Sequence, residues 1–145
     1  MKIIKHEFEI PQLSLVNGEL VECDAIKETY TFTLLHGGIG VFENNYGASL
    51  ISTLLKFNIG EGSEEERASR LLQDSNFIKE LASASYVKVD GGKFENTYAT
   101  AQEFKEKEVI NYLYDIDFVI KLIRMACDCI FEDKKQKNNN KTTKK

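Results

Sequence analysis

Three glycines near the middle of the sequence have the types and spacing of a phosphate-binding loop. Gly37, Gly38 and Gly40 lie in the segment HGGIGVFENNYG, residues 36–47. A strand-like run, YTFTLL, precedes this segment, and a helix-like run, ASLISTLLKF, follows it. Many proteins use glycines in this position to bring backbone N–H groups close to a phosphate at a helix N-terminus.

Neither common nucleotide-binding motif is present at these glycines. The dinucleotide fingerprint Gly-x-Gly-x-x-Gly, started at Gly38, needs a third glycine where the chain has Glu43. A carboxylate there would repel pyrophosphate, and no second parallel strand follows to complete a βαβ unit. The Gly92-Lys93 pair lacks the Ser/Thr and the upstream glycine of a P-loop. We therefore predict no cofactor, and expect Gly37 and Gly38 to provide a sharp turn with positive φ.

The other residues that could do chemistry form no recognisable motif. His6 and His36 stand alone in or beside expected strands, and the sequence has neither His-Glu-x-x-His nor Gly-x-Ser-x-Gly. Asp115 and Asp117 diverge on a helix, which favours a solvated helix surface. We predict no catalytic residue and no metal site. A catalytic set that assembles only in the folded chain remains an open alternative.

The three cysteines indicate free thiols, because an odd number cannot pair fully within one chain. Cys127 and Cys129 are two residues apart, so on a helix they point about 200° away from each other. They could neither bridge nor jointly hold a metal there. With Cys23, we expect them to be plain buried thiols.

Length and composition predict one domain. The chain has 145 residues, of which 42% are hydrophobic and 29% charged, as in globular proteins. No run of about 18 apolar residues predicts a membrane span, and the charged N-terminus has no signal-peptide core. We therefore expect a cytoplasmic protein that contacts no membrane.

The charge is unevenly distributed along the chain. Residues 134–145, KKQKNNNKTTKK, contain six lysines and no acid, whereas residues 1–133 carry 13 basic and 23 acidic side chains. An acidic body argues against a nucleic-acid-binding surface. We predict a single α+β domain over 1–133 and a disordered Lys/Asn-rich tail over 134–145.

The N-terminal region predicts a small antiparallel β-meander or hairpin. The runs KIIKHEFEI, LSLVNGELVEC and ETYTFTLL are rich in alternating, β-branched and aromatic residues. Asn17-Gly18 is a strong signal for a tight hairpin turn, since both residues tolerate positive φ. We expect three or four strands, with Pro11 lying between two of them.

Helical spacing begins after Gly38 and continues to the end of the domain. Gly47 is expected to divide the first part into two short helices. Ser63 with Glu66 predicts a capping box at the start of a later helix. Asp90-Gly91 indicates a small hairpin or a loop.

A heptad pattern then predicts a long C-terminal amphipathic helix in a predominantly α-helical bundle, with an isolated coiled coil as the alternative. The pattern consists of Val109, Leu113, Ile116, Ile120, Ile123, Cys127 and Ile130.

One helical face is a candidate surface for binding a partner. Phe42 and Tyr46 are four residues apart, and Leu50 and Leu54 continue the same spacing. The alternative is that Phe42 and Tyr46 pack on the N-terminal sheet.

The order of these elements, with Phe42-Glu43-Asn44-Asn45-Tyr46-Gly47 after the strand YTFTLL, resembles the tail assembly chaperones of long-tailed (siphovirus-type) bacteriophages. The resemblance covers most of residues 2–131 in element order, and residues 30–57 carry its motif. The Lys-rich tail is compatible with the frameshifting that extends such proteins, because Lys137-Asn138 can be encoded by the slippery run AAA-AAC.

The resemblance implies a binding function without enzymatic activity. Such chaperones coat the tape measure protein, keep it from aggregating, recruit tail tube subunits, and leave the finished particle. It implies the tape measure and tail tube proteins as partners, self-association, and a location in the host cytoplasm rather than the mature virion. Two alternatives stay open: another small phage or bacterial structural or adaptor protein, and a small enzyme or regulator whose site the sequence does not reveal.

Overall fold

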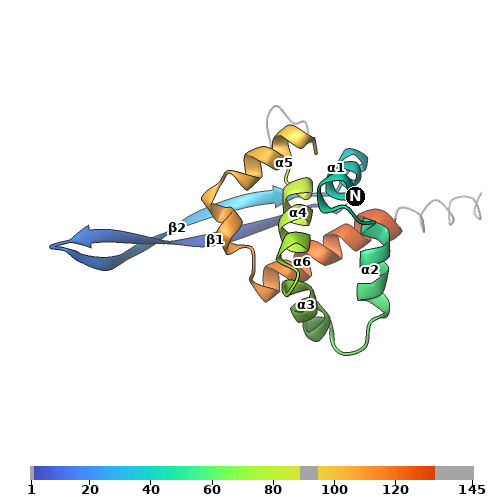
Figure 1. The fold of residues 1–145 in the computed structure, drawn as a ribbon, viewed down its shortest axis with the longest axis horizontal. Helices are drawn as coiled ribbons and strands as arrows, with labels where there is room; N and C mark the ends of the chain where they lie inside the picture. The colour runs from blue at the N-terminus through green and yellow to red at the C-terminus, as the bar shows by residue number, and fades with distance from the viewer. Residues whose placement is uncertain (1, 89–94, 133–145) are drawn as a thin grey trace, which may run out of the picture.

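The structure is a computed structural model that describes residues 2–88 and 95–132 (Figure 1). It has the expected α+β class, with an antiparallel β-hairpin followed by six α-helices in the described residues. The predicted tail, residues 134–145, and the Asp90-Gly91 loop or hairpin lie outside the described residues.

The hairpin consists of strands β1 (Ile4–Val16) and β2 (Glu19–Phe32). Asn17 and Gly18 form the two-residue turn with φ values of 53° and 79°, which confirms the predicted turn. The expected meander of three or four strands is wrong, because each strand continues through the point where a break was expected.

Pro11 lies inside β1 rather than between strands. The pairing passes from Ile10–Ile26 to Gln12–Cys23, so β2 has one more residue than β1 across this step. Such a bulge tolerates a proline, because the proline has no N–H group to donate to the partner strand.

The helices follow in chain order. They are α1 (His36–Tyr46), α2 (Leu50–Ile59), α3 (Glu64–Leu72), α4 (Ser75–Ser85), α5 (Tyr98–Lys105) and α6 (Ile116–Cys127). Gly47 ends α1 with φ 84°, as predicted, and Ser63 begins α3 by accepting the N–H of Glu66 at 3.2 Å. The two reciprocal side-chain-to-backbone hydrogen bonds of a capping box are found instead between Thr97 and Thr100, at the start of α5.

The predicted long C-terminal helix is divided into three segments. Glu108–Tyr112 form a 3-10 helix, α6 begins after Asp115, and Asp128–Glu132 form a π-helix. The carboxylate of Asp115 accepts the N–H of Asp117 at 3.4 Å and so caps α6. Asp115 and Asp117 are both exposed, as expected, but Asp115 is the N-cap of α6 and does not lie within a helix.

One hydrophobic core joins the hairpin base to the helices. Its centre is an aromatic cluster in which Phe32 lies 5.3 Å from Phe118 and 5.6 Å from Phe104, measured between ring centroids. Phe8 lies 4.8 Å from Phe118. The N–H of Thr33 donates to the carbonyl of Ser85, the last residue of α4, and Phe32 forms an isolated antiparallel bridge with Tyr86. The chain at the end of α4 therefore pairs with the end of β2. The helices thus cover only the base of the hairpin, where β1 begins and β2 ends.

Candidate interaction surfaces

The glycine-rich segment serves packing rather than phosphate binding. Gly38 lies inside α1, and a Cβ there would be 2.6 Å from the Asn96 Oδ1 atom and 2.8 Å from the Ala84 carbonyl oxygen. The Asn96 side chain accepts the N–H of Leu35 at 2.8 Å and donates to the Tyr86 carbonyl at 3.2 Å. The helix N-terminus is thus occupied by Asn96, which sequence reasoning missed.

The expected positive φ at Gly37 and Gly38 is wrong. Among the described residues, the glycines with positive φ are Gly18, Gly47 and Gly62. Gly37 and Gly38 instead allow the close approach of α1 to the segment that contains Asn96.

The predicted partner-binding face of Phe42, Tyr46, Leu50 and Leu54 lies inward. Phe42, Leu50 and Leu54 are fully buried, and Tyr46 is half-buried. Phe42 and Tyr46 stack at 5.0 Å and both meet Phe77 of α4, so they pack on a helix and not on the sheet. The hydroxyl of Tyr46 donates to Asp74, which raises the pKa of that hydroxyl to about 12. These four side chains belong to the core and form no exposed face.

An open groove of about 530 Å³ lies between β1 and the 3-10 helix, and titratable side chains line it. His6, Glu7, Glu9 and Asp115 line it. Glu7 and Glu9 alternate with His6 along the strand, so they point to the other face. In the described part of the chain, no hydrogen bond joins two of these side chains. The arrangement lacks the linked nucleophile and base, or acid and base, that catalysis requires.

His6 itself is held by aromatic rings. Its ring lies 4.6 Å from that of Phe8 and 4.9 Å from that of Phe118, and its buried Nδ1 atom has no hydrogen-bond partner among the described residues. Burial, and then the charge of Lys121, lower the pKa of His6. His36, by contrast, is exposed at the start of α1.

The cysteines are free thiols in three different environments. Cys129 is buried and Cys127 is half-buried, whereas Cys23 is exposed on the hairpin, so the expectation of burial is wrong for Cys23. Burial raises the pKa of Cys127 to about 11. Within residues 2–88 and 95–132, no three His, Cys, Asp or Glu side chains are placed to hold a metal ion.

Most of the exposed large apolar side chains of the described residues lie on the far half of the hairpin, residues 11–26, which we call the arm. Figure 1 shows the arm extending away from the helices. Six apolar side chains on it keep between 43% and 72% of their surface in water. They are Leu13, Leu15, Val16, Leu20, Val21 and Ile26. A two-stranded ribbon has only marginal stability in water by itself, so an exposed apolar arm indicates a surface for another protein.

The strand pairing explains why the helices leave the arm uncovered. Leu13 and Leu15 lie on the face of β1 opposite to Phe8 and Ile10, because side chains alternate along a strand. Leu15 pairs with Leu20, so these three leucines share one face. The apolar side chains of β1 therefore change face at Pro11, and the arm's leucines point away from the helical core.

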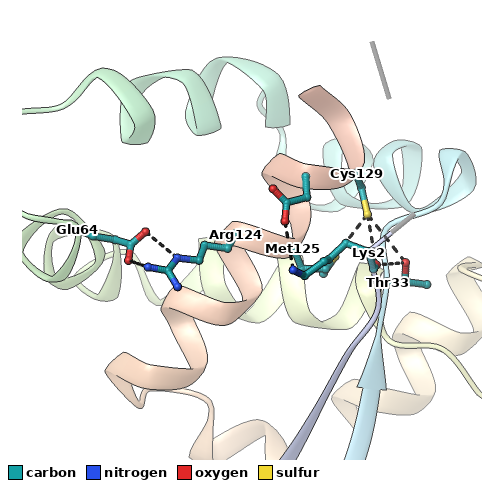
Figure 2. A network of polar contacts seen from close by, with 7 residues as sticks. Lys2, Thr33, Glu64, Arg124, Met125 and Cys129 are labelled. Atoms are coloured by element: carbon teal, nitrogen blue, oxygen red, sulfur yellow. Dashed lines mark hydrogen bonds and ion pairs between the residues drawn. The ribbon is translucent and has the colours of Figure 1, made fainter. Parts of the chain in front are cut away.

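The base of the hairpin is tied to the C-terminal segment. The Thr33 hydroxyl donates to the Lys2 carbonyl at 2.6 Å, and the Cys129 thiol donates to the same carbonyl at 3.6 Å. The Lys2 ammonium lies 3.6 Å from the Asp128 carboxylate. Figure 2 shows these contacts between the two ends of the domain. They anchor the base from which the arm projects.

A groove of about 380 Å³ lies between α2 and α3. Phe57 and Leu71 line it, and the Arg67 guanidinium lies 5.0 Å from the centre of the Phe57 ring. Lys56, Glu61 and Arg70 are also part of its wall. A bidentate ion pair joins Arg124 of α6 to Glu64 of α3, the helix that forms one side of the groove (Figure 2).

Apart from the residues that line this groove, α2 carries two exposed apolar side chains. Ile59 is 80% exposed and Leu55 is 46% exposed. Ile59 follows Lys56 by three residues, so the two are neighbours on the helix surface. Leu55 and Ile59 are each two residues from Phe57, so they point about 200° away from it on the helix and do not line the groove.

No helix among the described residues combines the length and the apolar character that crossing a membrane demands. Comparison of the chain with protein-family models, with curated proteins and with solved structures found no match.

Proposed function

We propose that this protein is a phage tail assembly chaperone that binds the tape measure protein and has no enzymatic activity. The observation that supports this is the arm, which extends away from the helices (Figure 1) and exposes six apolar side chains. A binding protein needs such a surface, whereas an enzyme needs convergent polar groups in a cleft.

The arm suits a client with apolar stripes along its length. Complete burial of one large apolar side chain contributes about 1.5–3 kcal/mol, and the arm's side chains are already partly buried. Association costs about 4–15 kcal/mol in lost freedom, so a single arm binds weakly. Many copies on one long client would still hold it, because each linked contact adds avidity.

The resemblance adds the remaining parts of the proposal. The helices act as a bundle that carries the arm, and tail tube subunits are recruited to the coated tape measure protein. The chaperone works in the host cytoplasm and is left out of the mature virion. Its acidic body, with a net charge of −10 over residues 1–133, keeps crowded copies from aggregating.

Co-expression tests this proposal directly. The tape measure protein encoded downstream is expressed in bacteria with and without this protein, and its soluble fraction is measured. We expect the protein to raise that fraction and to co-purify with the client. A client that stays equally insoluble in both cultures would refute the proposal.

The gene provides an independent test. The proposal predicts a tail tube gene upstream and a very long tape measure gene downstream. It also predicts a slippery heptamer within codons 134–145, followed by an overlapping −1 frame. A genomic context without tail genes would favour the alternative of an unrelated adaptor protein.

A further inference from the structure

We propose that the arm selects its client by charge. One face of the arm, which we call the leucine face, exposes Leu13, Leu15 and Leu20, and it takes an amphipathic helix whose apolar stripe is bordered by lysine or arginine side chains. Glu22 lies on the same face and recognises the basic border. The inference rests on the proposed function, because it specifies the chemistry of the client segment that the arm binds.

The leucine face is the most exposed apolar part of the hairpin. Its three leucines keep between 63% and 72% of their surface in water. Val16 and Val21, which lie on the opposite face because side chains alternate along a strand, keep 49% and 43%. The helices lie at the base of the hairpin (Figure 1), so none of the described helices covers the leucine face. Burial of these leucines by another protein is favourable in proportion to the apolar area removed from water.

A helix is the occupant that fits this face. The face of a sheet is covered by helices or by a second sheet. This hairpin already packs on a helix at its base, where the ring of Phe8 in β1 lies 4.8 Å from that of Phe118 in α6. A second arm is a poor alternative, because two leucine faces in contact would enclose two Glu22 carboxylates, and like charges across an interface are unfavourable.

The charge of the arm indicates which helices it prefers. Residues 11–26 contain three acidic side chains and neither lysine nor arginine. Glu22 pairs with Leu13 and so belongs to the leucine face, whereas Glu19 pairs with Val16 and belongs to the opposite face. In the described part of the chain, no ion pair uses Glu22. Its carboxylate is therefore available to a basic side chain beside the client's apolar stripe.

This carboxylate distinguishes between helices that have the same apolar stripe. One exposed pair of opposite charges changes an affinity by up to about fivefold. A pair of like charges at the same place acts in the opposite direction. Specificity is the difference between the two, so a helix with basic borders is favoured over one with acidic borders.

Two synthetic peptides provide the probe. Both are amphipathic helices with the same stripe of leucines, and the borders of the stripe carry lysines in one peptide and glutamates in the other. Fluorescence anisotropy of the labelled peptides measures their affinity for the full chain. We expect the lysine peptide to bind about tenfold more tightly than the glutamate peptide, with a difference that shrinks at high salt.

Two charge variants locate this preference on one face. Glu22→Lys should reduce the preference for the lysine peptide by about tenfold, because an attractive charge is replaced by a repulsive one. Glu19→Lys is the matched control, since it adds the same charge at an exposed position of the opposite face. It should keep most of the preference. Equal affinity of the wild type for both peptides, or an equal loss of preference in the two variants, would overturn selection by Glu22.

Two apolar variants test the assigned face. Leu13→Thr with Leu15→Thr should abolish binding of both peptides, whereas Val16→Thr with Val21→Thr should leave it unchanged. Threonine keeps the strand preference of the ribbon, and circular dichroism checks that each variant melts within a few degrees of the wild type. Leu15→Thr alone replaces the double variant if that variant is destabilised. A leucine-face variant that binds the lysine peptide as the wild type does would overturn the assigned face.

The outcome can be separated from that of the proposed function. A wild type that binds neither peptide but keeps the tape measure protein soluble overturns this inference and leaves the proposed function in place. A wild type that prefers the lysine peptide but leaves the tape measure protein insoluble supports the selection by charge and refutes the proposed function.

Discussion

Gly38 shows at the scale of a single residue how packing can require a glycine. A Cβ at this position would lie 2.8 Å from the Ala84 carbonyl oxygen and 2.6 Å from the Asn96 side chain. We expect Gly38→Ala to lower the free energy of unfolding by about 1–3 kcal/mol, as overpacking does. Gly40→Ala is the matched control, because no atom lies within 4 Å of its Cβ, and it should stabilise α1 by about 0.5–1 kcal/mol. Equal losses for both in urea unfolding would contradict this account.

His6 should make stability depend on pH. Its pKa in the folded protein is lowered by burial and by Lys121, so the unfolded chain binds a proton more readily. The contribution of neutral His6 is present above its unfolded pKa of 6.5 and is lost as the pH falls towards the folded pKa. We therefore expect the free energy of unfolding to fall more between pH 7.5 and 5 in the wild type than in His6→Gln. If the free energy of unfolding falls equally in the wild type and in His6→Gln, His6 does not contribute to the pH dependence of stability.

Single residues also mark what the sequence could and could not predict. Asn17-Gly18 and Gly47 were predictable, because a local turn explains the positive φ at each. The requirement for glycine at position 38 was not predictable, since Asn96 lies 58 positions away in the chain and approaches Gly38 only in the folded protein. The burial of Phe42 shows the same limit, because helical spacing gives an apolar face without saying what covers it.

At the scale of elements, the C-terminal region shows why a pattern can mislead. Val109 and Leu113 are fully buried although they precede α6, so the heptad spacing continues across a break in the helix. The break depends on Asp115, whose side chain accepts a backbone N–H at 3.4 Å. An aspartate within an apolar repeat is equally consistent with an exposed helix position, and the sequence alone does not separate the two.

Replacement of Asp115 distinguishes the two arrangements. As the cap of α6, Asp115→Ala should cost about 0.5–2 kcal/mol. Within a continuous long helix the same change would be neutral or stabilising, because alanine is the better helix former. Lys121→Ala, at an exposed position inside α6, is the control and should change little. Thermal or urea unfolding measures both variants, and an Asp115→Ala protein as stable as the control would favour the continuous helix.

At the scale of the whole molecule, the feature of most consequence is the separation of the arm from the core. Sequence reasoning missed the arm, because Pro11 was read as the boundary of a strand. One signal was present: Leu15, Val16, Leu20 and Val21 surround the turn, so apolar residues lie on both faces of the ribbon. A hairpin buried on one face alternates apolar and polar residues instead. Which side of the ribbon the helices cover depends on contacts with residues far along the chain, such as Phe104 and Phe118, and alternation along the strands does not show it.

The central claim is that the arm is the surface with which this protein holds a client. The most direct test measures the soluble fraction of the tape measure protein on co-expression with three forms of the chain. These are the wild type, the Leu13→Thr/Leu15→Thr/Leu20→Thr arm variant, and Tyr98→Ser, which removes an exposed apolar side chain elsewhere.

The account predicts that the wild type and Tyr98→Ser keep the client soluble, whereas the arm variant leaves it in the pellet. An arm variant that keeps the client as soluble as the wild type does would contradict the claim.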